Sequence, residues 1–240
     1  MESLVKSNRP WLAPLIAFLS ALLLFSLNLD RPPYPDELHH VLAAQHLLET
    51  GRPLLAEGEY WRGILYTWAV AISYKVFGEG LASARIPSVL LVAFVAPILF
   101  AWVRREAGFV AALLTAVLFL SSPLTVEIAQ FSRFYSLQMF SFLLGTLCFY
   151  YAVAGTLPAL RRIILGVLAA ALLVLAISAQ LTSLFGILGA MSWALGIVVI
   201  RVFFAPETSQ TVKRVVATIL IAAGVAIVMA ATLTDVIQLG

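Results

Sequence analysis

Residues Ile163–Phe204 have the sequence IILGVLAAALLVLAISAQLTSLFGILGAMSWALGIVVIRVFF. This stretch contains a single charged side chain, that of Arg201. As one helix, these roughly 42 residues would extend about 63 Å, twice the hydrocarbon core of a bilayer. A turn must therefore divide the stretch, and the polar sequence SAQLTS at 178–183 is the place for it. We predict two membrane-spanning helices here, and an all-α polytopic membrane protein as the fold class.

The composition of the whole chain supports this class. Of the 240 residues, 62% are apolar and 11% are charged, whereas soluble domains carry about 25% charged residues. The polar surface that a soluble enzyme of this length needs is missing, which excludes the soluble enzyme classes. The one cysteine, Cys148, can form neither an internal disulfide nor a cysteine-built metal site. Nothing resembles a basic face for nucleic acid.

Seven apolar runs are candidates to cross the bilayer, which requires about 20 mainly apolar residues. They are Trp11–Asn28, Pro87–Val103, Ala107–Val126, Phe134–Gly155, Ile163–Gln180, Ser183–Phe204 and Val215–Thr232. The run Gly63–Gly78 is shorter and contains Lys75, so we expect it to lie in a loop. Residues 1–240 are thus predicted to form one transmembrane module of about seven helices.

The basic residues give this topology an orientation. If Gly63–Gly78 does not cross, the basic groups all fall on one side, which the positive-inside rule makes the cytoplasm. These groups are Lys6/Arg9, Arg104/Arg105, Arg161/Arg162, Arg201 and Lys213/Arg214. We therefore predict a multi-pass protein of the inner or plasma membrane with a cytoplasmic N-terminus. Residues 30–85 then form one extracytoplasmic loop with two amphipathic helices at the membrane surface.

The first of these two helices carries a pair of acidic residues. We expect Asp36–Thr50 to be helical, because Pro35 stands at its entry and Gly51 follows its end. Asp36 and Glu37 fall in the first turn. Carboxylates there can cap the helix and complement its dipole, or one of them can act as a general base. The residues alone leave both roles open.

All three histidines, His39, His40 and His46, lie in the same predicted helix. One alternative is a divalent metal held between this helix and another loop, although no HExxH pair is present. The other is that these are ordinary histidines of a membrane interface. No cofactor is certain from the sequence, and we assign no metal ligand.

Two arginines on the same predicted face have the chemistry to bind phosphate. Arg62 begins the second amphipathic helix, and Arg133 lies between the third and fourth spans. A guanidinium suits forked recognition of phosphate, but the neighbouring Trp61 and Tyr135 also fit simple snorkelling at the interface. Glu127, near the end of the third span, could either pair with Arg133, the role that we favour, or line the site.

Six short segments of the chain occur in an order and with a spacing that are typical of a known superfamily. They are Tyr34-Pro35-Asp36-Glu37, HLLETG at 46–51, RGILYTW at 62–68, Val76-Phe77-Gly78, SARIPS at 83–88 and SRFYS at 132–136. Together they resemble the N-terminal half of the GT-C glycosyltransferases, in the pattern of the protein O-mannosyltransferases and lipid A aminoarabinose transferases. The similarity covers about residues 30–151, and the remainder is similar in hydropathy alone.

The resemblance implies an enzyme that transfers a sugar, with inversion, from a polyprenyl-phosphate donor to a lipid, glycan or protein on the extracytoplasmic face. In the family, an Asp of the first outer loop takes the acceptor's proton; it matches Asp36, with Glu37 as its companion. Arg62 and Arg133 match basic residues that contact the donor phosphate. His39, His40, Glu127 and Tyr135 are further candidates to line the site. The implied partners are the lipid-linked sugar, an unassigned acceptor and the bilayer.

Two other classes remain as alternatives. One is a transporter or flippase, in which buried charges mark a path; the predicted spans hold almost no ionisable groups away from their ends. The other is a non-catalytic scaffold or a seven-helix receptor, but the predicted cytoplasmic N-terminus inverts the usual receptor orientation. Because members of the GT-C superfamily usually continue through further spans, we expect these residues to be the N-terminal part of a longer enzyme.

Overall fold

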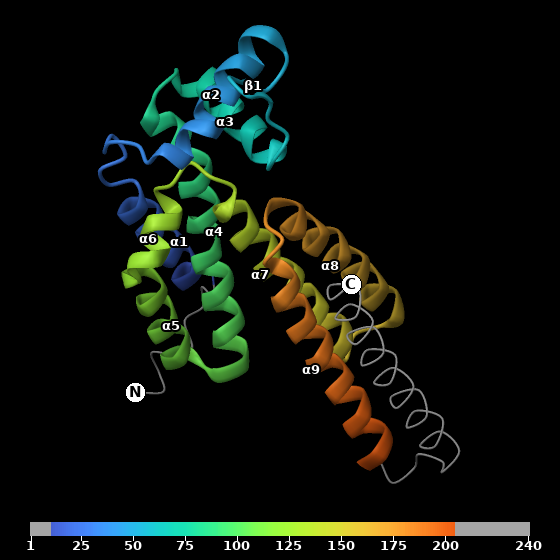
Figure 1. The fold of residues 1–240 in the computed structure, drawn as a ribbon. Helices are drawn as coiled ribbons and strands as arrows, with labels where there is room; N and C mark the ends of the chain where they lie inside the picture. The colour runs from blue at the N-terminus through green and yellow to red at the C-terminus, as the bar shows by residue number, and fades with distance from the viewer. Residues whose placement is uncertain (1–10, 205–240) are drawn as a thin grey trace, which may run out of the picture. The chain divides into compact units, whose positions relative to one another are not determined.

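A computed structural model describes residues 11–204, and the predicted span Val215–Thr232 lies outside them. The described part is almost entirely helical (Figure 1). Its elements are α1 (Leu12–Phe25), α2 (Pro35–Thr50), β1 (Leu54–Leu55), β2 (Gly58–Glu59), α3 (Ile64–Phe77), α4 (Leu81–Ala107), α5 (Phe109–Ser121), α6 (Pro123–Ala129), α7 (Tyr135–Ala154), α8 (Ala159–Ala179) and α9 (Ser183–Phe204). The chain divides into two compact units after Leu184, so nearly all of α9 belongs to the second.

Four of the described helices, α4, α7, α8 and α9, are long and apolar enough to cross a membrane, and the pair α5 and α6 would make a fifth if it is one span. The chain is therefore a membrane protein with four or five candidate spans among residues 11–204. The helix found at the predicted first span, α1, has 14 residues, fewer than the roughly 20 of a straight span. The predicted turn at 178–183 is confirmed, because α8 ends at Ala179 and α9 begins at Ser183.

The predicted span Ala107–Val126 is wrong as a single straight helix. The chain breaks at Ser122, whose backbone is extended, and Pro123 starts α6 at an angle of 64° to α5. Proline restricts the residue before it to extended conformations and has no N–H to continue the preceding helix. The serine-proline pair therefore ends α5 and redirects the chain toward the loop at 130–134.

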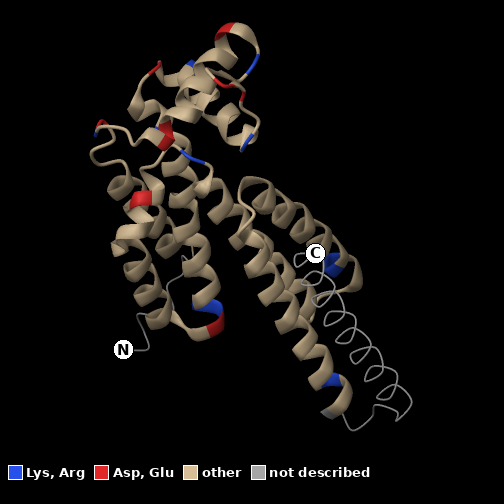
Figure 2. Cartoon of the chain, viewed as in Figure 1, with Lys and Arg blue, Asp and Glu red and all other residues tan. Residues whose placement is uncertain are grey.

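Helix α4 is the centre of the first unit and packs against α1, α3, α5, α6 and α7. Small side chains allow its closest contacts, since alanines of α1, α4 and α5 share one buried cluster. Charged residues of this unit gather near the helix ends and in the part formed by α2, α3 and the β1–β2 hairpin (Figure 2). That part lies beyond one end of α4 (Figure 1).

The start of α4 differs from the prediction, which placed residues up to about Arg85 in a loop. The helix begins at Leu81 and continues through Pro87. A proline inside a helix leaves the carbonyl four residues earlier without its amide partner, here that of Ser83. The Ser73 hydroxyl of α3 donates to this carbonyl at 2.6 Å. A side chain of the neighbouring helix thus compensates for the bond that Pro87 removes.

Candidate functional site

The two acidic residues at the start of α2 have different surroundings. Helix α2 runs over Pro35–Thr50 with Gly51 in the left-handed conformation, φ 77°, as the sequence predicts. Successive helical residues point about 100° apart. Asp36 consequently faces outward with 59% of its side chain exposed, while Glu37 is fully buried. Only the first of the pair is accessible to a substrate.

Glu37 forms a buried ion pair with Arg85 of α4. Arg85 donates from Nε and Nη2 to the two carboxylate oxygens of Glu37, at 2.9 and 2.7 Å, and neither side chain is exposed. Its Nη1 donates to the backbone carbonyls of Leu29 and Arg31. The arginine therefore joins α4 both to α2 and to the segment that precedes it.

The Glu37 carboxylate also fixes the loop that carries Arg133. It accepts the backbone N–H of Ser132 at 2.8 Å and that of Tyr34 at 3.0 Å. Burial acts to raise the pKa of Glu37, but the hydrogen bonds from Arg85, Ser132 and Tyr34 outweigh it and hold that pKa below its ordinary value. Glu37 is ionised and held in place. It positions Asp36, the residue before it in the chain, and it positions Arg133 through the hydrogen bond from the N–H of Ser132.

We call the buried pair of Glu37 and Arg85 the clamp. Asp36 and Arg133 form a second ion pair beside it, at the protein surface. The Arg133 guanidinium contacts the Asp36 carboxylate and donates to the Asp36 carbonyl at 3.3 Å. The hydrogen bond from Arg133 is the main reason that the pKa of Asp36 lies below its ordinary value, and positive charge at His39 and Arg62 adds to it. Asp36 is thus an ionised carboxylate beside an almost buried arginine. The prediction that Glu127 pairs with Arg133 is wrong, because Asp36 holds that position.

Arg62 and Arg133 both contact the aromatic ring of Phe134. The guanidinium carbons of Arg62 and Arg133 lie 4.9 and 5.2 Å from the centre of the Phe134 ring, distances at which cation–π attraction operates. Arg62 also donates to the side-chain carbonyl of Gln180 at 2.9 Å. Gly63 permits this approach: it has φ 63°, and a Cβ there would lie 2.8 Å from Phe134. The two predicted phosphate contacts therefore share a single platform.

His40 lies behind the site and is packed like a core residue. It is fully buried, its Nδ1 is 2.9 Å from the Thr67 hydroxyl, and the rings of Tyr60, Tyr66 and Phe134 surround it edge-on. Burial, with the positive charge of Arg133, His39 and Arg62, lowers the pKa of His40 to about 3. The imidazole ring is therefore neutral near pH 7, and its role is to pack against the neighbouring aromatic rings.

The other residues that the sequence predicted for the site are His39, Tyr135 and Glu127. His39 stacks on Tyr60 with ring centroids 5.6 Å apart, and Tyr135 lies under the Arg133 guanidinium at 5.5 Å. Glu127 is exposed on α6. Within residues 11–204, no three His, Cys, Asp or Glu side chains come close enough together to hold a metal ion.

Comparison with known proteins adds no family: the chain matches no family model, no curated protein and no solved structure. The arrangement places an exposed carboxylate, two guanidiniums and an aromatic ring next to the buried Glu37–Arg85 ion pair, near the start of the candidate membrane-spanning helix α4. Such a group can accept a proton and bind an anion at adjacent positions.

Proposed function

We propose that this chain is a membrane glycosyltransferase, or the N-terminal module of one, that uses a polyprenyl-phosphate sugar on the extracytoplasmic face. The observation that carries this proposal is the contact between the exposed carboxylate of Asp36 and Arg133, next to Arg62 on the shared Phe134 ring. A proton acceptor and an anion-binding pair side by side are what displacement of a phosphate by a hydroxyl or amine requires. The GT-C resemblance names the same residues from sequence.

In the proposed reaction, the acceptor's oxygen or nitrogen attacks the anomeric carbon of the donor sugar. The bond between that carbon and the phosphate oxygen breaks, and its electron pair leaves with the lipid phosphate. Asp36 takes the proton that the acceptor loses. Arg62 and Arg133 stabilise the charge that grows on the leaving phosphate, as fixed cations near a developing anion do.

The Asp36–Arg133 contact gives this scheme an order. While Arg133 pairs with Asp36, the pKa of the carboxyl lies below its ordinary value, and such a carboxylate is a weak base. A donor phosphate that takes over the Arg133 guanidinium removes this hydrogen bond, so the pKa of Asp36 rises toward its ordinary value. Donor binding would then strengthen the base.

Arg133→Ala is expected to weaken binding of the lipid-phosphate donor by roughly tenfold or more, because a hydrogen bond to a charged group contributes about 1.5–3 kcal/mol. Titration calorimetry with a polyprenyl-phosphate sugar and the full chain in nanodiscs measures this. Arg52→Ala is the matched control, since Arg52 is exposed and pairs with Glu59 instead. An Arg133→Ala protein that binds donor as tightly as the wild type would contradict the phosphate role.

Orientation belongs to the same proposal, because the site must face the extracytoplasmic side. Glu57 and Arg161 are exposed, and Cys148 can first be replaced by alanine. We expect a membrane-impermeant maleimide to label Glu57→Cys in intact cells and Arg161→Cys only after permeabilisation. Labelling of both from the same side would overturn the topology.

A further inference from the structure

The polar turn at 178–183, between α8 and α9, is joined to the candidate site by one side chain. The side-chain carbonyl of Gln180 accepts a hydrogen bond of 2.9 Å from Nη2 of Arg62. The two residues are 118 positions apart in the chain and belong to the same compact unit. The turn, which the sequence marks only as a break between two helices, therefore reaches one of the two arginines of the site.

Hydrogen bonds hold Gln180 itself in a fixed place. Its backbone N–H donates to the carbonyl of Ala176 at 2.9 Å, and its own carbonyl accepts the N–H of Ser183 at 3.1 Å. The Ser183 hydroxyl donates to Ala176, and it accepts a bond of 3.0 Å from the side-chain amide of Gln138 in the first turn of α7. The turn is thus tied to the helix that begins just after the loop that carries Arg133.

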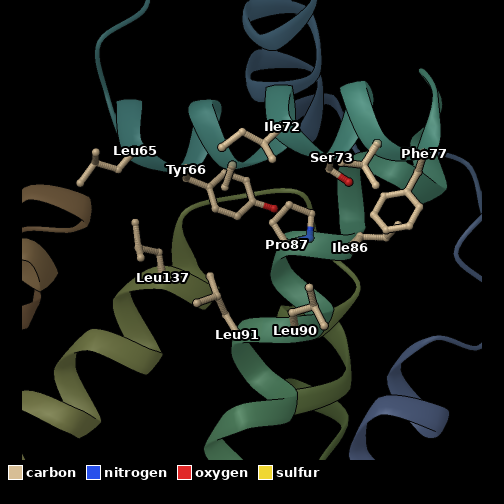
Figure 3. Close-up of a pocket in the computed structure, with 12 residues that line it drawn as sticks. Leu65, Tyr66, Ile72, Ser73, Phe77, Ile86, Pro87, Leu90, Leu91 and Leu137 are labelled. Atoms are coloured by element: carbon tan, nitrogen blue, oxygen red, sulfur yellow. The ribbon is translucent and has the colours of Figure 1, made fainter.

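Apolar packing leaves open space near the bond between Arg62 and the turn. Leu65, near the start of α3, and Leu137, in the first turn of α7, line an apolar cavity of about 360 Å³ (Figure 3). A separate cavity of about 120 Å³ lies between the start of α3 and the end of α8, and Trp61 and Ala179 are part of its lining. Because open space supplies no van der Waals contacts, the hydrogen bond is the specific link between Arg62 and the turn.

Gln180 holds Arg62 without neutralising it. The side-chain carbonyl of a glutamine accepts a hydrogen bond but carries no charge. Arg133, by contrast, is paired with the carboxylate of Asp36, whereas no ion pair among residues 11–204 includes Arg62. Immobilising a long side chain is one of the costs of binding. The exposed Arg62 guanidinium therefore keeps its full charge for an anion and is already in place before the anion arrives.

We infer that Gln180 is a positioning residue of the anion site, which holds Arg62 ready for the phosphate of the donor. The inference rests on the proposed function for the identity of the anion. It adds the α8–α9 turn to the site, and it gives a reason for an uncharged residue at position 180. A carboxylate there would form the same bond to Arg62 but would repel the phosphate.

The test compares two substitutions that a positioning role and a purely structural role rank in opposite order. The full chain in phosphatidylcholine nanodiscs is titrated with farnesyl phosphate and with farnesol, which has the same hydrocarbon chain but no phosphate. Gln180→Ala removes the bond and should weaken binding of farnesyl phosphate about threefold to tenfold, because Arg62 must then be immobilised on binding. Gln180→Glu keeps the bond but adds a negative charge, and should weaken binding by about tenfold or more.

Two further measurements separate the roles. Gln180→Glu should unfold at a temperature no lower than the wild type, because the link to Arg62 is kept. If Gln180 only braced the turn, this variant would bind farnesyl phosphate as tightly as the wild type, which would overturn the inference. In an Arg62→Ala protein, Gln180→Ala should cause no further loss of affinity, since its effect passes through Arg62. Losses that simply add would contradict a positioning role.

Gln45→Glu is the matched control, because Gln45 is another half-buried glutamine and its side chain bonds Glu79 instead of an arginine. Its affinity for farnesyl phosphate should equal that of the wild type, and a loss as large as that in Gln180→Glu would count against the inference.

The outcomes also distinguish this inference from the proposed function. A wild type that binds farnesyl phosphate no more tightly than farnesol would overturn both. Phosphate-dependent binding that Gln180→Glu leaves unchanged would overturn the role of Gln180 alone. Binding that depends on Gln180, in a protein that transfers no sugar, would overturn the transferase alone and support the anion site.

Discussion

Replacement of Asp36 by Asn is expected to lower the rate of sugar transfer by roughly a hundred- to ten-thousand-fold, the range for loss of a general base. An amide has the shape of the carboxylate and can stay at the start of α2, but it cannot take a proton from the acceptor. Because the Asp36 side chain is 59% exposed, the change should leave folding and membrane insertion intact. Release of polyprenyl phosphate from a lipid-linked sugar donor, by the purified full-length protein, measures the rate.

Glu49→Gln is the control for the Asp36→Asn variant, since Glu49 is an exposed carboxylate of the same helix and contacts His46 instead of the arginines. Its rate should equal that of the wild type. Donor affinity should not fall in Asp36→Asn, because the variant frees Arg133 from its acidic partner. Transfer at the wild-type rate by Asp36→Asn would exclude Asp36 as the base and leave it as an acidic residue that complements the dipole of α2.

Glu37→Ala is expected to cost about 3–5 kcal/mol of stability, the usual consequence of leaving one member of a buried ion pair without its partner. Arg85 would remain buried with a charge that only the carbonyls of Leu29 and Arg31 contact. The Ser132 and Tyr34 amides would lose their acceptor as well. Thermal unfolding in detergent, followed by circular dichroism, should show a large fall in the transition temperature.

Two comparisons make the Glu37 result specific. Glu57→Ala, at an exposed position of the β1–β2 turn, should change stability by less than about 0.5 kcal/mol. Arg85→Lys keeps the charge but cannot contact both carboxylate oxygens and two carbonyls from one planar fork, so it should be destabilised too. If Glu37→Ala unfolded at the wild-type temperature, the clamp would not be what holds α2, α4 and the Arg133 loop together.

Local patterns predict part of this structure well. Pro35 and Gly51 mark the ends of α2, and the polar run at 178–183 marks the turn before α9. The sequence also contained a signal for the break at Ser122, which the predicted span Ala107–Val126 missed: a residue before proline is disfavoured in the helical conformation. In each case the decisive residues are neighbours in sequence, where conformational rules act directly.

The ion pair of Glu37 and Arg85 was not predicted, because its partners are 48 residues apart and nothing local indicates that they meet. The predicted topology placed Arg85 at the end of the extracytoplasmic loop of residues 30–85. A signal existed, since an arginine beside the apolar run that begins at Pro87 is costly unless it is paired. Asp36, Arg62 and Arg133 were each named from sequence, but the Phe134 ring that brings the two arginines together is visible only in the folded chain.

The bond between Ser73 and the Ser83 carbonyl has a mechanical consequence. At Pro87 the α4 backbone lacks the hydrogen bond that would resist bending there, and its place is taken by a hydroxyl from α3. The part of α4 that follows Pro87 can therefore tilt against the first turns of the helix with one backbone hydrogen bond fewer to oppose it. Because the donor hydroxyl belongs to Ser73 of α3, we expect α3 to move together with the first turns of α4 when the rest of that helix tilts.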